Sequence, residues 1–190
     1  MRKQTFIKLS AAALTVTALL CSCGGSDGGA LPGYKEISNE GVSYDLYVPD
    51  EWVIDEQTAF TAAHRSTTDP SNISVMALEL TNANNFESYD EYWKKSVEPS
   101  LKAMFPTIEY VTECKSYNLD GIEAAEYVYT TTVHHGYNPD GTASEVKYKY
   151  QQIIAKKNGT VYTLTFTANE QLYDGAAEEV AAIWSNFRFH

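Results

Sequence analysis

The chain has few of the features that mark a disulfide-stabilised or a nucleic-acid-binding protein. Of its 190 residues only three are cysteines, and two of these, Cys21 and Cys23, lie close together near the N-terminus. Cys114 is then alone in the body of the chain, so no intrachain disulfide framework can form there. The stability of the domain must therefore come from a buried core.

Positive charge is also scarce. Fourteen Lys and Arg stand against 25 Asp and Glu, which gives a formal net charge of −11. Three of the basic residues, Arg2, Lys3 and Lys8, belong to the N-terminal segment, so the rest of the chain is more acidic still. An acidic surface repels the phosphates of nucleic acids and of anionic lipids. We expect no nucleic-acid partner and no electrostatic binding to membranes.

Motifs for covalent or cofactor chemistry are missing from the sequence. There is no serine-hydrolase elbow, no phosphate-binding loop and no dinucleotide-binding glycine pattern. The histidines do not have the spacing of a zinc finger or of a helical zinc site. We therefore expect no cofactor and assign no catalytic residue.

The N-terminus has the pattern of an export signal. Basic residues precede the apolar run Leu9–Leu20, which has 12 residues. As a helix this run would reach roughly 18 Å, short of the ~30 Å hydrocarbon core of a bilayer. A signal peptide over residues 1–22 therefore fits better than a membrane span.

The end of this leader, Leu20-Cys21-Ser22-Cys23-Gly24-Gly25, resembles the lipobox of bacterial lipoproteins. The resemblance implies cleavage before a cysteine that carries lipid. Cys23 fits better than Cys21, because small Ser22 precedes it whereas bulky Leu20 precedes Cys21. Ordinary secretion, with Cys23 free or paired, is the alternative. Several acyl chains on Cys23 would anchor the protein to a membrane on its extracytoplasmic face.

A short tether separates this cysteine from the predicted domain. Residues 24–30, GGSDGGA, are rich in Gly and Ser and offer almost nothing to bury. We assign residues 23–33 to the lipidated cysteine and its tether, and residues 34–190 to one folded domain.

The clearest β pattern is the stretch Val146–Ala168. Two runs of β-forming residues flank Asn158-Gly159, the pair that most readily forms a tight hairpin turn. Alternation places Tyr148, Tyr150, Gln152 and Ile154 on one face of the first run, and Tyr162, Leu164, Phe166 and Ala168 on one face of the second. We expect a central hairpin of an antiparallel sheet.

Similar alternation predicts further strands on both sides of a helix. Strands are expected at 41–48, in the extended run 52–65, and at 73–80, 108–114 and 121–133. A helix is expected from Ser88, a predicted cap, to Phe105, kinked or divided at Pro99. A last helix spans 174–187 with Asp174 as its cap, and 187–189 returns beside the sheet. Segregated strands and helices indicate an α+β fold: an antiparallel sheet of about six or seven strands flanked by helices.

Four segments, in this order, resemble the PsbP/Mog-like family of α/β/α sandwich domains. They are Tyr47-Val48-Pro49-Asp50-Glu51-Trp52, Leu119–Tyr127 with its Asp120-Gly121, the strand Tyr162–Thr167, and the closing stretch Ile183–Phe189, where Asn186 replaces the usual Ser. The resemblance spans residues 34–190 and implies the fold. It implies binding to other macromolecules rather than one activity, since family members include photosystem subunits, a nuclear-transport accessory and many exported lipoproteins.

The candidate metal ligands are His134 and His135, with Asp140 or Glu145. Adjacent strand residues point to opposite faces, so both histidines cannot easily bind one ion. We expect polar hairpin-end residues and assign no metal. Cys114 would be a nucleophile only beside a histidine and is expected to pack. Glu178 and Glu179 are expected on a solvated helix face.

The chain also contains 14 tyrosines, and these leave two interpretations open. Tyr127 with Tyr129, and Tyr148 with Tyr150, share strand faces. They form either an exposed aromatic row that stacks on a sugar or protein partner, or cross-strand pairs beneath the helices.

We expect an exported, lipid-anchored, non-catalytic binding or accessory module of the cell envelope. Its partners are the bilayer, through Cys23, and a protein or glycan. An extracytoplasmic enzyme acting on envelope or nutrient polymers is the alternative, and a carrier of metal or a small ligand is a weaker one.

Overall fold

The computed structural model describes residues 31–190 apart from 39, 56–59 and 83–84. The predicted signal peptide, Cys23 and most of the tether lie outside the described residues. The strands are β1 Tyr34–Glu36, β2 Tyr44–Asp45, β3 Tyr47–Pro49, β4 Val53–Ile54, β5 Thr61–His64, β6 Asn72–Glu79, β7 Glu109–Leu119, β8 Ile122–Tyr137, β9 Ala143–Lys157, β10 Thr160–Asn169 and β11 Arg188–Phe189. The helices are α1 Tyr89–Tyr92, the π-helical turn η1 Trp93–Val97, α2 Glu98–Met104 and α3 Glu170–Ser185.

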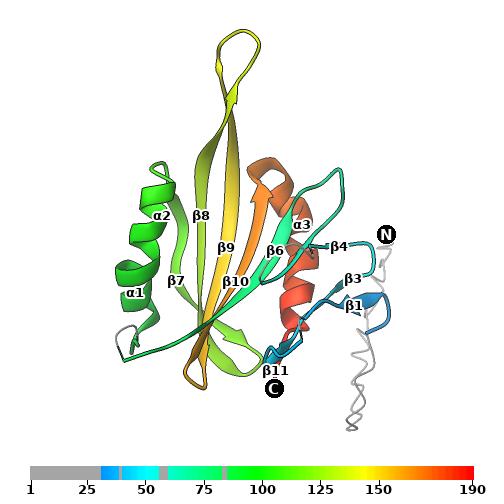
Figure 1. Cartoon of the computed structure of the whole chain (residues 1–190), viewed down its shortest axis with the longest axis vertical. Coiled ribbons are helices and arrows are strands. Elements are labelled where there is room, and N and C mark those ends of the chain that lie inside the picture. The colour runs from blue at the N-terminus through cyan, green and yellow to red at the C-terminus, as the bar shows by residue number, and fades with distance from the viewer. Residues whose placement is uncertain (1–30, 39, 56–59, 83–84) are drawn as a thin grey trace, which may run out of the picture.

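A seven-stranded antiparallel sheet organises the domain, with the order β4-β5-β6-β10-β9-β8-β7. This confirms the predicted α+β fold. β6 lies beside β10, not beside the next strand β7, because the chain crosses the sheet through α1, η1 and α2 before it enters β7 (Figure 1). The end of the chain does not join this sheet: β11 pairs with β2 through Arg188 opposite Asp45 and Phe189 opposite Tyr44.

The predicted central hairpin is present as β9 and β10. Asn158 and Gly159 have φ angles of 51° and 78°, the left-handed conformation that a two-residue hairpin turn requires. Thr160 pairs with Lys157 directly across this turn.

The first helix is capped and divided as predicted. The Ser88 hydroxyl accepts a hydrogen bond from the Glu91 N–H at 3.4 Å. Before Pro99 the helix widens into η1, where the Glu98 N–H bonds to the Trp93 carbonyl, five residues back. Proline has no N–H and crowds the preceding turn, so a wider turn accommodates it.

The last helix begins earlier than predicted. α3 starts at Glu170, and Asn169 caps it by accepting a hydrogen bond from the Gln171 N–H at 3.1 Å. Asp174, the predicted cap, lies inside the helix and pairs with Lys149 at 3.3 Å. Among the described residues, no helix is long and apolar enough to cross a membrane.

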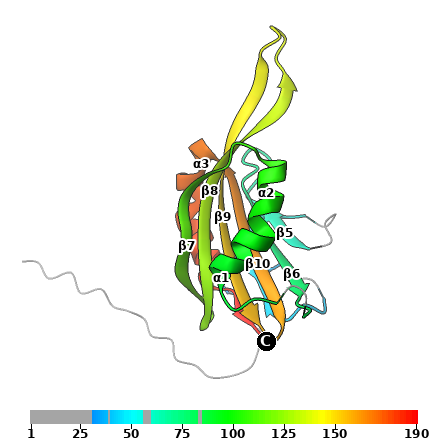
Figure 2. The same ribbon diagram turned by 90° about the vertical axis from the view of Figure 1, so that its left-hand side faces the viewer.

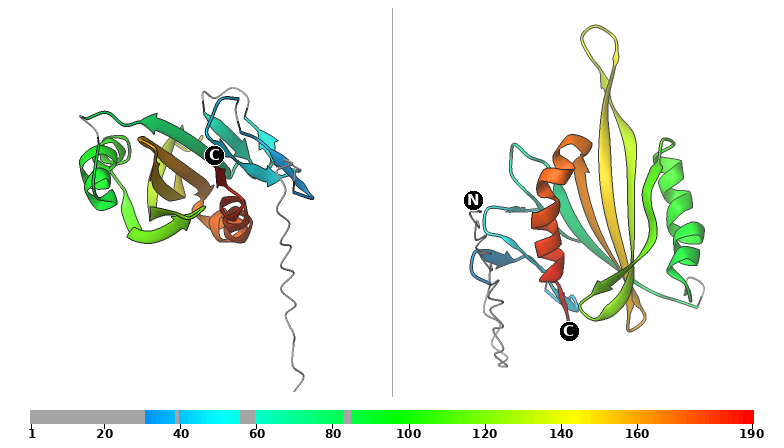
Figure 3. Two further views of the ribbon diagram at one scale, coloured as in Figure 1. Left: turned by 90° about the horizontal axis from the view of Figure 1, so that it is seen from below. Right: turned by 180° about the vertical axis from the view of Figure 1, so that it is seen from behind.

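The two helical layers lie on opposite faces of the sheet (Figures 2 and 3), and β9 and β10 contribute side chains to both cores. The α3-side core contains Trp52, Leu164, Phe166, Trp184 and Phe187 among its fully buried members. The α1-side core packs Trp93 and Leu101 against residues of β8 and β9.

Of the four tyrosines that the sequence left open, Tyr127, Tyr129 and Tyr150 belong to the α1-side core, and Tyr148 lies on β9 beside His135. Tyr127 and Tyr129 are each 1 % exposed, and Tyr129 stacks on Tyr150 with ring centroids 5.0 Å apart. These residues are cross-strand partners beneath a helix, not an exposed row.

Candidate functional site

One part of the sheet has no helix over it. α1, η1 and α2 pack on the strands β7 to β9, and α3 packs on the opposite face (Figures 2 and 3). On β6, Ile73 and Val75 point into the α3-side core, so Met76 and Leu78 project from the opposite face of the sheet. The Met76 side chain is 51 % exposed and that of Leu78 is 45 % exposed. Large exposed apolar side chains on an ordered strand are a candidate contact surface.

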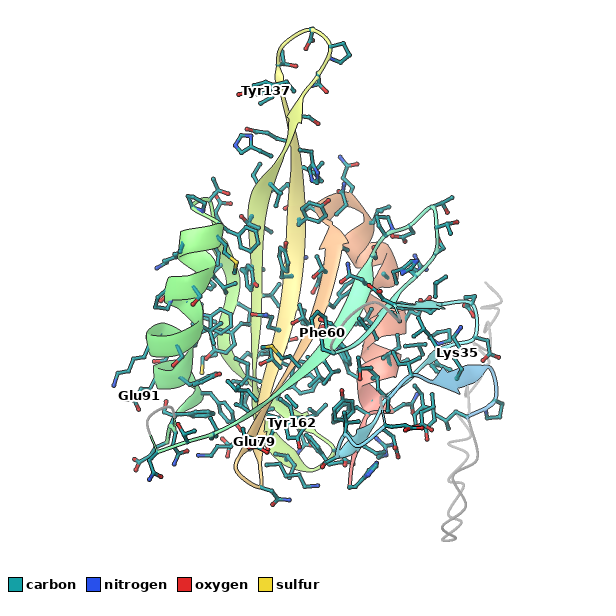
Figure 4. The ribbon with its side chains drawn as sticks, viewed as in Figure 1. Lys35, Phe60, Glu79, Glu91, Tyr137 and Tyr162 are labelled. Atoms are coloured by element: carbon teal, nitrogen blue, oxygen red, sulfur yellow. The ribbon has the colours of Figure 1, made fainter. Side chains whose placement is uncertain are left out.

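A hollow of about 560 Å³ opens at one end of this face, beside β5 and β6. Figure 4 shows Phe60, which lines it and is 43 % exposed. The other lining residues are Asp55, Ala62, Ala63, His64, Ser66, Thr67, Pro70, Asn72 and Ser74.

Strand pairing determines how the floor of the hollow is built. His64 lies directly opposite Asn72, and Ala62 lies directly opposite Ser74. Since side chains alternate along a strand, these two pairs project from the same face of the sheet. Polar groups thus sit on both strands with small side chains beside them.

Some polar groups of the hollow are not engaged elsewhere. Asn72 donates a hydrogen bond from Nδ2 to the Pro70 carbonyl at 3.2 Å, which leaves its Oδ1 as an acceptor. For the side chains of His64 and Ser74, no hydrogen bond or ion pair is present among the described residues. These groups are available to a ligand.

An ion-pair clamp holds the turn that walls the hollow. Arg65 binds Asp69 at 3.0 Å and Glu179 of α3 at 3.3 Å, and the Trp52 indole N–H also donates to Glu179. Burial acts to raise the pKa of Asp69, but hydrogen bonds from Ser71 and Arg65 outweigh it and hold the pKa below its usual value. The expectation of a solvated Glu178-Glu179 pair is therefore wrong for Glu179.

A two-stranded arm, residues 131–147, projects beyond the sheet (Figure 1). β7 pairs with β8 only as far as Thr130, and β10 pairs with β9 only as far as Tyr148. Beyond these points β8 and β9 pair with each other. Tyr137 near its tip is 82 % exposed (Figure 4).

The three predicted metal candidates all lie on this arm but do not converge. His134 Nδ1 is 3.3 Å from Glu145 Oε1, whereas His135 Nε2 lies 3.3 Å from the Tyr148 hydroxyl. Asp140 accepts two hydrogen bonds from Thr142, which lower its pKa and fix the turn. In the part of the chain that the structure describes, no three His, Cys, Asp or Glu residues form a group that could hold a metal ion.

Cys114 lies in an irregular part of β7. Its φ is 46°, and the pairing of β7 with β8 shifts register between Thr112 and Lys115. The side chain is partly buried against the α1-side core. This is the packing position that the sequence predicts.

The hollow is the part of the site that sequence reasoning missed. Its opposed polar residues on β5 and β6, such as His64 and Asn72, are eight positions apart, and the pairing of the two strands brings them together. The single available signal was polar Asn72 and Ser74 at alternate positions of an otherwise apolar strand.

Comparison with protein-family models and with curated protein sequences finds no match. Solved structures are similar in fold. Cyanobacterial PsbP (CyanoP) from Synechocystis is 16 % identical, with a TM-score of 0.58 over 90 % of this chain and 99 % of that one. LpqN, involved in cell envelope biogenesis of Mycobacterium tuberculosis, is 11 % identical, with a TM-score of 0.50 over 81 % and 88 %.

The Ran-binding protein Mog1p of Saccharomyces cerevisiae is 12 % identical, with a TM-score of 0.50 over 82 % of this chain and 95 % of that one. At such identities the likeness concerns the fold and not the activity. The seven-stranded sheet, its order and its two helical layers are thus those of a PsbP/Mog-like α+β domain.

Proposed function

We propose that the protein is an exported, lipid-anchored, non-catalytic binding module of the cell envelope. The observation that carries this proposal is the uncovered sheet face, with its exposed apolar side chains and the hollow beside β5 and β6. A partner, protein or glycan, would dock there, because an apolar surface rimmed by polar groups gains free energy when it is covered.

The anchor is proposed at Cys23. It is supported by the leader that precedes this residue and by the Gly/Ser-rich stretch that follows it. The first described strand, β1, begins at Tyr34, which fits a tether over residues 23–33 and a domain from 34 onward.

The structural neighbours agree with a binding role by analogy. LpqN is described as taking part in envelope biogenesis and Mog1p as binding Ran. Neither role passes to this chain through the fold, but Mog1p is an example of this fold in a protein that binds another protein.

The anchor is tested by fractionating cells that produce the wild type, Cys23→Ala or Cys21→Ala. We expect Cys23→Ala to leave the membrane fraction and to lose labelling by a fatty-acid analogue, while Cys21→Ala keeps both. The reverse pattern would move the anchor by two residues, and a wild type found in the cytosol would refute the proposal.

The docking face is tested with Met76→Asp, against Met104→Asp as the control. Both methionines are exposed, at 51 % and 62 %, but Met104 lies on α2. In-cell crosslinking followed by identification of the partner should give a defined complex that Met76→Asp loses and Met104→Asp keeps. Equal yields from both variants would exclude this face.

An extracytoplasmic enzyme remains the second candidate, because Asp55 and His64 line the same hollow. A carboxylate and an imidazole in one hollow can serve as general acid and base. Turnover of an envelope or nutrient polymer that disappears in His64→Ala would favour the enzyme over the binding module.

A further inference from the structure

We propose that the hollow beside β5 and β6 binds a neutral saccharide. This deepens the proposed function, on which it rests, by naming the class of ligand that the hollow takes. The argument uses the chemistry of the lining, the charges around it and the way in which the lining is held.

The lining offers the two kinds of surface that a sugar ring needs. A sugar presents C–H groups on its faces and hydroxyl groups around its edge. Phe60, Ala62 and Pro70 supply apolar surface for a face, and His64, Asn72 and Ser74 supply donors and acceptors for hydroxyls. Apolar walls with a few placed polar groups are the usual composition of a ligand site.

The charges of the lining argue against ionic ligands. None of the described lining residues is Lys or Arg, so a phosphate or carboxylate would be desolvated without a counter-charge. The neighbouring Arg65 is already held by Asp69 and Glu179. Asp55 is the single carboxylate among the described lining residues, too few for a bare metal ion.

An apolar ligand fits less well than a sugar. The imidazole of His64 and the Asn72 Oδ1 would lose water without gaining a partner if a lipid chain covered them, at a cost of about 1–3 kcal/mol for each buried group. A ligand that carries many hydroxyls replaces that water and avoids this cost.

The backbone that carries the polar groups is held in place before any ligand arrives. Direct strand pairing fixes the backbone of His64 and Asn72, and the Asn72 side chain is also bonded to the Pro70 carbonyl. The turn between β5 and β6 is held to α3 by the Arg65 clamp. A preformed site loses little side-chain freedom on binding, which favours weakly interacting ligands such as neutral sugars.

The size of the hollow suits a short stretch of a longer chain. Its volume of about 560 Å³ lies within the range of small-ligand sites. Since it opens to solvent at the sheet surface, a glycan can enter and leave it without being cut.

The test is affinity electrophoresis of the soluble domain, residues 31–190, after its circular dichroism and cooperative unfolding have shown that it folds. The gels contain amylopectin, mixed-linkage β-glucan, xyloglucan, galactomannan or soluble chitosan acetylated to near neutrality. Each polymer that slows the wild type is followed by calorimetry with its hexasaccharide. The variants are His64→Ala, which removes a polar group, and Ser74→Leu, which fills the hollow. Met104→Ala, at an exposed position of α2 outside the lining of the hollow, is the matched control.

We expect at least one neutral polysaccharide to slow the wild type and Met104→Ala equally. His64→Ala should weaken the affinity by about fivefold or more, and Ser74→Leu should abolish binding. The inference fails if no polymer slows the wild type, or if all variants bind alike. A defined protein complex that Met76→Asp loses, with no saccharide bound, would keep the proposed function and overturn this inference alone.

Discussion

The indole ring of Trp93 lies flat on the phenol ring of Tyr127, with centroids 3.8 Å apart and planes inclined by 5°. The Trp93 N–H donates to the Tyr110 hydroxyl at 3.0 Å, and that hydroxyl donates to Glu98 at 3.0 Å. One aromatic residue of η1 thus connects the helix, the edge strand β7 and its neighbour β8.

Replacing Trp93 by Ala should therefore destabilise the domain strongly. The change empties a fully buried site and leaves the Tyr110 hydroxyl without its donor, so we expect a loss of about 3–5 kcal/mol in the free energy of unfolding. Urea denaturation measures it. Met104→Ala, at a 62 % exposed position, should change stability by less than about 0.5 kcal/mol. Similar values for the two variants would contradict the stacked arrangement.

The Glu179 side chain should matter more than that of its neighbour Glu178. Glu179→Ala removes the carboxylate that accepts the hydrogen bond of the Trp52 indole and that pairs with Arg65. Trp52 is only 1 % exposed. We expect a loss of about 1–3 kcal/mol, because a buried donor is left unpaired. Glu178→Ala is the matched control and should be nearly neutral. Thermal unfolding of both variants measures this difference. Equal melting temperatures would show that the contacts of Glu179 with Trp52 and Arg65 do not stabilise the fold.

Alkaline pH should unfold the domain through its buried tyrosines. Burial raises the pKa of Tyr110 from 10.0 to about 12, and burial also raises the pKa of Tyr129 and Tyr127. A group whose pKa is raised on folding contributes stability that is present below the unfolded value, near 10, and is lost as the pH rises through the folded value. Stability should therefore fall between pH 10 and about 12.

Ultraviolet absorbance of tyrosinate and circular dichroism, followed together, measure this loss. The ionisation of the buried tyrosines should coincide with the loss of structure. Complete ionisation near pH 10 with native circular dichroism would show that these rings are accessible to solvent.

The arm should be dispensable for folding. Its residues pair with one another beyond the end of the sheet, and the Tyr137 side chain is mostly exposed to solvent. Replacing residues 134–145 by Asn-Gly would join the paired residues Val133 and Val146 through a two-residue turn. This change should alter the free energy of unfolding by less than about 1 kcal/mol. Guanidinium denaturation checks this, and a large loss would mean that the arm contributes to the core.

Alternating and four-residue patterns were enough to predict the long elements of this fold. Residues 146–168 form the predicted hairpin, and Pro99 divides the first helix as expected. The start of α3 was predicted at Asp174 because Asp is a good cap, but Asn169 caps the helix at the point where β10 ends. A local pattern cannot choose between two capping residues when tertiary contacts decide.

The short N-terminal strands and the hollow were beyond such patterns. β4 has two residues and β5 has four, too few for a period to emerge. β6 lies beside β10, and this placement depends on how the chain crosses the sheet between β6 and β7. His64 and Asn72 become neighbours through the pairing of β5 with β6, which the sequence pattern did not show.

Ile153 and Ile154 are consecutive residues of β9, both completely buried, and they belong to the α3-side and the α1-side cores respectively. A strand that is shared in this way cannot release one side and keep the other, so melting should be a single all-or-none event. Any molecule that docks on the open face would then protect α3 on the far side from proteases and from hydrogen exchange, with no movement of the backbone.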